Sequence, residues 1–338
     1  MIVVLGANGF VGSNVYRSIK EIYVCKVVPV DKEITLSSRN YLLDDVSSLI
    51  VSGELPEFIK HNNGVISHVV IMSGNSNTLG GEYYSLMEDN YEYPKRIIDL
   101  CLLYGIGVIY ASSASVYKYQ YKGTFRKELP INDYARSKFA LDEYVKNKID
   151  RREKVYGLRL FNVYGPNEEH KGNMSSMIYK LTNQYLNTGF MSVFGETDGY
   201  KSGEQKRDFI SVDRVANVVI DFLSNDYKSG IYDVGTGVPI SFNDIASLVY
   251  YTANSLPYNE LNSSELVENG VLRYTEISSE IRSYFQSYTC AVVDGVCHKH
   301  TTRSDSIYDI SRHIEWLIEK SITNAFERDI PPQRSICA

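Results

Sequence analysis

The stretch IVVLGANGFVG, residues Ile2–Gly12, joins a short apolar segment to a glycine-rich turn. Ile2–Leu5 is apolar throughout, as in a strand buried on both faces, and Ser13–Ile22 then shows the apolar spacing of a helix. A second apolar run, Val24–Val30, ends at Asp31. This order of strand, turn, helix and strand is typical of a βαβ unit. It predicts the α/β class, with a doubly wound parallel sheet of the Rossmann type.

The turn has the spacing G-x-x-G-x-x-G, at Gly6, Gly9 and Gly12. The first glycine permits a tight turn, the second lets backbone N–H groups approach phosphates, and the third allows the helix to pack closely on the strand. Because the turn follows an apolar strand and opens a helix, it predicts a site for a dinucleotide pyrophosphate. We expect Asn8 and Phe10, between the glycines, to belong to the same cofactor site.

The residues after the second apolar run bear on the choice of cofactor. Asp31 is placed to accept a hydrogen bond from a ribose hydroxyl, which favours NAD. Lys32 and Arg39 follow it and could neutralise the 2′-phosphate of NADP, or could equally be solvated surface charges. The pair Asp45-Val46 is a candidate to bind the adenine amino group, and Asp45 could equally cap a helix.

A second informative stretch is Tyr134-Ala135-Arg136-Ser137-Lys138, which places a phenol and an ammonium one helical turn apart on one face. Oxidation of a carbinol needs a base for the hydroxyl proton while hydride leaves. Tyrosine has an ordinary pKa near 10, and Lys138 together with the positive ring of an oxidised nicotinamide can favour its phenolate. The serine-rich segment Ala111–Tyr117, directly after a predicted strand, offers the hydroxyl donor. Together these residues predict proton transfer beside a nicotinamide cofactor.

The remaining pattern extends the alternation of strands and helices and then interrupts it. Between 165 and 207 the glycines and polar residues increase, which predicts a smaller lobe interleaved with the sheet domain. We expect a Rossmann domain over 1–165 plus 208–240, a substrate-binding lobe over 166–207 plus 241–305, and a closing helix over 306–322. The other predicted strands are 65–72, 108–111, 155–160, 209–212 and 231–234, and the other predicted helices are 82–104, 133–148 and 213–223.

Composition excludes several classes of function. The chain has 338 residues, 43% of them apolar and 22% charged, as in an ordinary soluble enzyme. A net charge of −6 gives no support to a nucleic-acid partner, and no apolar run is long enough for a membrane span. Five cysteines without an export signal predict reduced thiols in a cytoplasmic protein. The run Cys297–His300 matches no closed tetrahedral metal set, so we expect no metal.

More specific segments follow the sheet pattern: RLFNVYGP at Arg159–Pro166, HKGNMSS at His170–Ser176, and KRDFI at Lys206–Ile210. With the glycine turn and the Y-x-x-x-K stretch, they make the chain similar to the extended short-chain dehydrogenase/reductases that act on nucleotide sugars, the NAD-dependent epimerase/dehydratase family. The H-K-G-x-M segment resembles that of the ADP-L-glycero-D-manno-heptose 6-epimerases. This resemblance implies inversion of a sugar carbon through transient oxidation to a ketone and return of hydride to the opposite face.

The resemblance also implies roles for individual residues and a set of partners. It implies a nucleotide-diphosphate sugar as substrate and a homo-oligomer, and it shifts the cofactor narrowly toward NADP, tightly bound. Catalytic roles fall on Tyr134, Lys138, Ser113 and, as a second acid/base on the other face of the sugar, Lys171. Asn90 joins the cofactor site, while Asn162, Asn173, Arg207 and Arg282 join Ser113 and Lys171 in the substrate site, with Arg207 at the diphosphate.

Other functions compete with epimerisation at the heptose C6. Another nucleotide-sugar epimerase, reductase or dehydratase would use the same residues. Dehydration is disfavoured because the segment Ser113–Tyr117 lacks the Asp-Glu pair usual beside the catalytic hydroxyl of 4,6-dehydratases. A non-catalytic NAD(P)-binding sensor is the alternative from another class, and such a protein would be expected to lose Tyr134 or Lys138.

Overall fold

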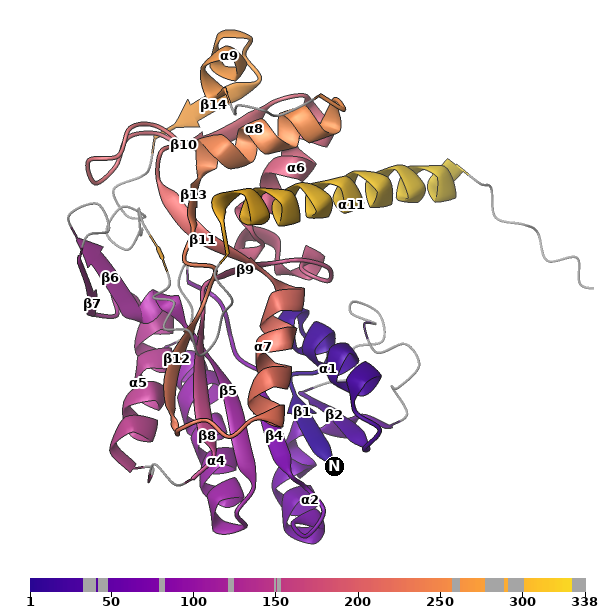
Figure 1. Ribbon diagram of the computed structural model, residues 1–338, viewed down its shortest axis with the longest axis vertical. Helices are drawn as coiled ribbons and strands as arrows, with labels where there is room; N and C mark the ends of the chain where they lie inside the picture. Colours follow the sequence, from indigo (N-terminus) through magenta and orange to yellow (C-terminus); the bar gives the residue numbers. More distant parts are fainter. Residues whose placement is uncertain are drawn as a thin grey trace, which may run out of the picture.

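The computed structural model describes residues 1–32, 41, 48–78, 83–120, 125–148, 150, 153–256, 262–276, 289–290 and 301–329. Within these residues, seven strands form one parallel sheet in the order β12-β8-β5-β4-β1-β2-β3, in the lower half of Figure 1. The predicted α/β fold with a Rossmann-type sheet is confirmed. The strands are β1 (Ile2–Leu5), β2 (Val27–Asp31), β3 (Ile50–Val51), β4 (His68–Ile71), β5 (Gly107–Ser113), β8 (Val155–Leu160) and β12 (Gly230–Val234).

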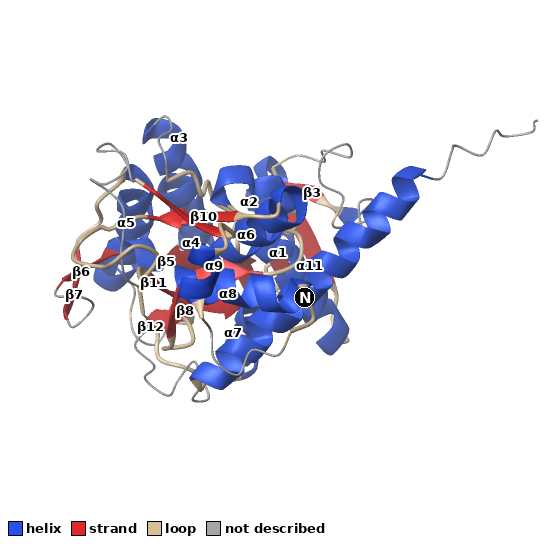
Figure 2. Ribbon diagram, turned by 90° about the horizontal axis from the view of Figure 1, so that it is seen from above, coloured by secondary structure: helices blue, strands red, loops and turns tan. Residues whose placement is uncertain are grey.

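The apolar run of β1 is explained by burial on both faces. Ile2 and Val4 belong to a core shared with α1 (Phe10–Ile22) and α7 (Val212–Ser224). Val3 and Leu5 belong to the core on the opposite face, shared with α2 (Leu55–Asn62), α4 (Tyr93–Leu103) and α5 (Asp133–Lys148). Figure 2 shows helices on both sides of the strands. The strand order reverses between β1 and β4, and ligands of such sheets bind in the crevice at that point.

The helix predicted over 82–104 is interrupted. It consists of α3 (Tyr83–Met87), a π-helical turn η3 (Glu88–Glu92) and α4. Pro94 explains the interruption, because its ring would clash with the carbonyl of residue 90 in a continuous α-helix and it has no N–H to donate. The wider turn resolves this conflict and places Asn90, which is fully buried, inside the molecule.

Other predicted bounds shift slightly. The helix predicted over 133–148 and the strand predicted over 155–160 have these bounds in the structure. The helix predicted from 13 begins at Phe10, and the strand predicted from 24 begins at Val27, because Val24 is fully exposed. Helix α11 (Arg303–Asp329) extends beyond the predicted 306–322, and α7 lies one residue beyond 213–223 at each end.

The upper half of the molecule has its own core. The strand predicted over 209–212 is β11 (Lys206–Ser211), and it pairs with β9 (Asn162–Tyr164) and β13 (Pro239–Ser241) outside the parallel sheet. Strands β10 (Met191–Phe194) and β14 (Leu272–Thr275) pair above them. Helices α6 (Met177–Thr188), α8 (Phe242–Ala253) and α11 pack around this core, and α11 extends away to one side (Figures 1 and 2).

The smaller elements complete the description. A hairpin of β6 (Tyr117–Gln120) and β7 (Phe125–Glu128) projects beside α5. The short turns are η2 (Ser52–Glu54), η4 (Ala114–Val116) and η6 (Glu169–Met174), and α9 (Ser263–Glu268) lies at the top of Figure 1. In the part of the chain that the structure describes, no helix combines the length and apolarity needed to cross a membrane.

Replacement of Gly12 by alanine should destabilise the protein. A Cβ at Gly12 would lie 1.9 Å from the carbonyl oxygen of Gly6, which is backbone and cannot rotate away. We expect Gly12→Ala to lower the free energy of unfolding by about 2 kcal/mol, the usual cost of overpacking. Chemical denaturation measures this change.

Gly53→Ala is the matched control. Among the described atoms, none lies within 4 Å of a Cβ built at Gly53. Its free energy of unfolding should stay within about 0.5 kcal/mol of wild type. Equal stability of both variants would contradict the tight packing of α1 against β1.

Candidate active site

A cavity of about 1430 Å³ opens at the carboxyl ends of β1, β4 and β5, below the elements of the upper core. It is lined by the glycine turn, the loop after β4, the end of β5, the first turns of α5, and segments near residues 160–180 and 207. Asp45, Val46 and Arg282 lie outside the described residues, as does Arg39. The predicted residues that line the cavity are Gly6, Asn8, Gly9, Phe10, Asp31, Lys32, Ser113, Tyr134, Lys138, Asn162, Lys171, Asn173 and Arg207.

The glycine turn fits a phosphate group. Gly6 has φ of +86°, and a Cβ there would lie 2.5 Å from the backbone nitrogen of Ser73, so the turn presses against the end of β4. Helix α1 begins at Phe10 with Gly9 as its N-cap, and no side chain caps its first N–H groups. A helix N-terminus with uncapped N–H groups and its dipole directed at the cavity suits an anion. Gly12 lies behind the turn and makes this packing possible.

Asp31 ends β2 at the rim of the cavity. Its carboxylate accepts hydrogen bonds from the backbone N–H groups of Asn8 at 2.8 Å and Lys32 at 2.7 Å. The ammonium of Lys32 forms an ion pair with Asp89 of the π-helical turn. The charge of Lys32 is therefore directed to Asp89, while the carboxylate of Asp31 binds backbone N–H groups.

Tyr134, Ser113 and Lys138 come together where β5 meets α5. Tyr134 and Ser113 both line the cavity there, and Lys138 Nζ donates to the carbonyl of Ala111 at 3.0 Å. Burial raises the pKa of Tyr134, and the neighbouring Ser113 side chain opposes this rise. Burial lowers the pKa of Lys138 to about 8, against the negative charge of Asp142. In the protein alone Tyr134 therefore stays protonated, and a role as base requires added positive charge beside the phenol.

Asn90 does not line the cavity but fixes two of its walls. Its Oδ1 accepts from the backbone N–H of Asn75 at 2.9 Å, and its Nδ2 donates to the carbonyl of Asn75 and to Ser137 Oγ, both at 2.9 Å. Ser137 Oγ donates in turn to the carbonyl of Tyr134 at 2.8 Å. Asn90 thereby ties the loop after β4 to the helical turn that carries Tyr134.

Lys171 reaches the same cavity from η6, far along the chain from Tyr134. Its ammonium lies 5.4 Å from the ring centroid of Phe10. Burial lowers the pKa of Lys171, and Glu168 raises it. The structure therefore brings a second proton-bearing group into the cavity that holds Tyr134.

Sequence reasoning missed Glu168, which holds the turn carrying Lys171. This carboxylate is 1% exposed and accepts from the backbone N–H groups of Gly165 at 3.2 Å and Ser176 at 2.6 Å. It also accepts from the hydroxyl of Ser176 at 3.0 Å. A glutamate two residues after a G-P sequence carries no periodic signal, so only the fold reveals this role.

The far end of the cavity contains the other predicted substrate residues. Asn162 Nδ2 donates to Thr289 Oγ1 at 2.8 Å and to the carbonyl of Asp208 at 3.1 Å. The guanidinium of Arg207 lies 5.4 Å from the ring centroid of Phe242, and burial lowers its pKa to about 10. Sequence reasoning missed Thr289, which lines the cavity and whose hydroxyl accepts a hydrogen bond from the backbone N–H of Asp208 in β11.

A model of the NAD dependent epimerase/dehydratase family matches residues 2–235, about two thirds of the chain. This chain belongs to that family. The matched region contains the glycine turn and the residues Ser113, Tyr134, Lys138, Lys171 and Arg207.

Solved structures of similar fold include several epimerases. The ADP-L-glycero-D-manno-heptose-6-epimerase of Helicobacter pylori is 24% identical, with a TM-score of 0.70 over 93% of this chain and 95% of that chain. A UDP-N-acetylglucosamine 4-epimerase from Methanobrevibacter ruminantium is 20% identical, with a TM-score of 0.72 over 96% and 98%. The UDP-glucose 4-epimerase of Thermus thermophilus, in complex with NAD, is 17% identical, with a TM-score of 0.70 over 93% and 98%. At these identities the likeness shows the shared fold of the epimerase/dehydratase family.

Asn90→Ala should loosen the pocket of this family member. The change removes a fully buried amide and leaves the backbone of Asn75 and the hydroxyl of Ser137 without their partner. We expect the free energy of unfolding to fall by about 2 kcal/mol, because buried polar groups are left unsatisfied. Chemical denaturation again provides the measurement.

Asn63→Ala is the control for this change. Asn63 is exposed and donates to the carbonyl of Lys60 at the end of α2. Its loss should change the free energy of unfolding by about 0.5 kcal/mol or less. If Asn90→Ala changed the free energy of unfolding as little as this control, the hydrogen bonds that join the loop after β4 to α5 would contribute little to stability.

Proposed function

We propose that this chain is a nucleotide-sugar epimerase that inverts a carbinol carbon by transient oxidation. The observation that carries the proposal is that Tyr134 and Lys171 line the same cavity from different segments of the chain. Inversion needs a proton-bearing group on each face of the sugar, because the hydride leaves one face and returns to the other. Neither a one-face reductase nor a binding protein requires both groups.

The chemistry follows from the substrate carbon. A carbon with no neighbouring carbonyl is not acidic, so its hydrogen must leave as hydride. A bound nicotinamide dinucleotide supplies the hydride acceptor and returns the same hydride. Tyr134, assisted by Ser113, removes the hydroxyl proton as the carbon becomes a ketone. The ketone must then turn so that its opposite face receives the hydride, and Lys171 gives a proton to the oxygen. Solvent returns the proton held by Tyr134 to Lys171, so the atoms balance with no net oxidation.

The charges of the cavity suit a nucleotide diphosphate. Its substrate end is lined by Lys171, Lys180 and Arg207, and the described residues that line this end include no carboxylate. Arg207, with a pKa of about 10, is charged at neutral pH. Such a surface attracts a dianionic group, whereas a neutral free sugar carries no charge that these cations could attract.

Within this class we propose ADP-glycero-manno-heptose as the substrate and inversion at C6 as the reaction. The support is the H-K-G-x-M segment, which forms the turn η6 and carries Lys171 into the cavity. Other nucleotide sugars are the alternatives, and a substrate panel separates them.

We further propose NAD as the tightly held cofactor, in place of the NADP narrowly favoured by the sequence. Asp31 keeps its negative charge at the ribose position, while the ammonium of Lys32 pairs with Asp89. A 2′-phosphate would therefore meet a carboxylate beside a lysine whose charge is directed to Asp89; Arg39, the other cation expected there, lies outside the described residues.

The experiment uses purified protein, ADP-D-glycero-D-manno-heptose and a panel of UDP-hexoses in D2O, followed by NMR of the products. We expect inversion of the heptose without deuterium at the inverted carbon, because the hydride never exchanges with solvent. Tyr134→Phe should lower kcat by about 10²–10⁴, the range for loss of a general acid/base. Lys171→Met should lose epimerisation by a similar factor yet, when supplied with NADH, still reduce an aldehyde analogue through Tyr134.

Tyr104→Phe and Lys60→Met are the matched controls, since both residues lie outside the cavity and are partly or largely exposed. Both should turn over like wild type. Solvent deuterium at the inverted carbon would refute transient oxidation. Normal epimerisation by Lys171→Met would remove the second acid/base, and a protein that binds the cofactor but converts no sugar would be a sensor.

The cofactor is identified by denaturing the purified protein and measuring the mass of the nucleotide that is released. We expect NAD. Asp31→Ser should raise the affinity for NADP relative to NAD by about tenfold, because a like charge beside the 2′-phosphate is removed. Release of NADP from the wild-type protein would overturn the assignment.

A further inference from the structure

A buried ion pair lies beneath the helix that carries Tyr134 and Lys138. Asp142 Oδ2 of α5 accepts from Arg159 Nε of β8 at 2.7 Å, and Asp142 Oδ1 accepts from the hydroxyl of Tyr110 at 3.0 Å. The Asp142 side chain is fully buried, and that of Arg159 is 3% exposed. Charges so far from water are retained only with well-placed partners.

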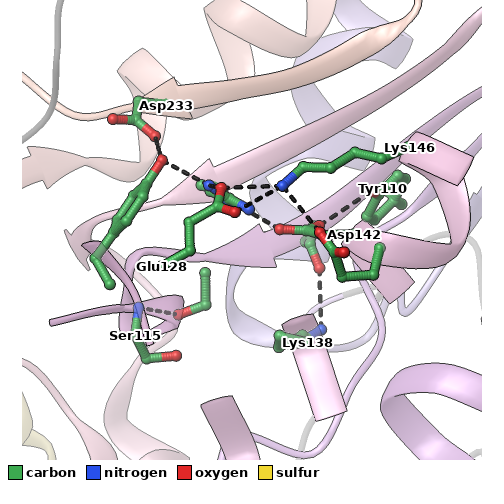
Figure 3. A network of polar contacts seen from close by, with 12 residues as sticks. Tyr110, Ser115, Glu128, Lys138, Asp142, Lys146 and Asp233 are labelled. Atoms are coloured by element: carbon green, nitrogen blue, oxygen red, sulfur yellow. Dashed lines mark hydrogen bonds and ion pairs between the residues drawn. The ribbon is translucent and has the colours of Figure 1, made fainter. Parts of the chain in front are cut away.

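Arg159 also forms hydrogen bonds with groups other than Asp142. Its Nη1 donates to the hydroxyl of Tyr117 at 2.7 Å and to Glu128 at 2.6 Å. The hydroxyl of Tyr117 donates in turn to Asp233 at 2.7 Å. The contacts thus run from Asp233 through Tyr117 and Arg159 to Asp142, with Glu128 as a branch on Arg159. Figure 3 shows Asp233, Glu128 and Asp142 in this network, with Lys138 below them. Arg159 is therefore fixed from both sides, and it fixes Asp142.

Asp142 lies four residues after Lys138, on the same face of α5. Lys138 is 6% exposed and donates to the carbonyl of Ala111. A buried ammonium tends to lose its proton, and the negative charge of Asp142 opposes this loss. Asp89 acts in the same direction with a smaller effect, and its carboxylate pairs with Lys32. Asp142 is therefore the main counter-charge that the structure provides for Lys138.

The other carboxylates on α4, α5, β7 and β12 whose pairs the structure shows are engaged elsewhere. These pairs are Asp99 of α4 with Lys95 and the hydroxyl of Tyr144, Asp233 of β12 with Arg126 and Tyr117, Glu128 of β7 with Lys146 and Arg159, and, on α5, Asp133 with Arg136 and Glu143 with Lys146.

We propose that Asp142, held by Arg159 and Tyr110 one helical turn beyond Lys138, is a positioning residue whose charge keeps the ammonium of Lys138 protonated at the cofactor end of the cavity. Asp142 itself touches neither cofactor nor substrate. The inference rests on the proposed function in that Lys138 serves a bound nicotinamide dinucleotide. Asp142 would affect cofactor binding only by changing the protonation state of Lys138.

The test is the affinity for NADH, measured by fluorescence as added NADH replaces the bound cofactor, from neutral to alkaline pH. A charged Lys138 favours the cofactor, so affinity weakens as pH rises through the pKa of Lys138. Asp142→Asn removes the charge that raises this pKa, and the weakening should begin about one pH unit lower. Asp142→Glu, which keeps a carboxylate, should move it back toward wild type.

Glu143→Gln is the matched control. It removes a partly exposed carboxylate of α5 that pairs with Lys146 but leaves the charge beside Lys138, so its titration should follow wild type. If Asp142→Asn binds NADH with the wild-type pH dependence, the proposal is overturned. Should Asp142→Asn not fold, Tyr110→Phe removes one donor to Asp142 and keeps the ring, and it should give a smaller shift in the same direction; no shift there also overturns the proposal.

The outcomes separate this inference from the proposed function. A wild-type protein that binds NADH but epimerises no nucleotide sugar defeats the proposed function, while the titration still reports on Asp142. A wild-type protein that epimerises, with an Asp142→Asn variant that titrates unchanged, defeats the inference alone. A wild-type protein that binds no NADH overturns both.

Discussion

The close approach of Gly12 to the carbonyl of Gly6 is the constraint on which the rest of the site depends. With 1.9 Å between that oxygen and a would-be Cβ, α1 can start directly at the end of β1 only if residue 12 is glycine. The helix N-terminus then lies at the point where the strand order reverses, between β1 and β4. Because parallel strands end at the same edge, Ser113 of β5 and the start of α5 arrive at this crevice as well.

Buried polar groups hold the walls of the crevice in one arrangement. Asn90 binds both Asn75 and Ser137, and Arg159 binds Asp142 under the same helix. Apolar packing is non-directional and would tolerate small slides of α5 on the sheet. A buried amide or carboxylate is stable only where its donors and acceptors meet, so these contacts fix the helix in register as well as in place.

The turn that carries Lys171 is held by hydrogen bonds more than by a hydrophobic core. The turn η6 contributes no buried residue of its own, and Gly172 within it has φ of +50°. Glu168 replaces the missing core by binding backbone N–H groups on both sides of the turn. This arrangement explains how a short irregular segment can direct Lys171 to the cavity, whereas Tyr134 is directed by a regular helix.

The sequence by itself determined the features that repeat within one element: the apolar strands, the glycine spacing, and the phenol and ammonium on one face of α5. These are local, since a strand or helix is recognised by its own period. The tertiary structure decided which segments meet. It pairs Lys32 with Asp89, places β11 outside the parallel sheet, and brings Lys171 into the cavity of Tyr134. Such contacts join residues far apart in the chain, and they arise from packing and from the burial of charge, which leave no period in the sequence to be read.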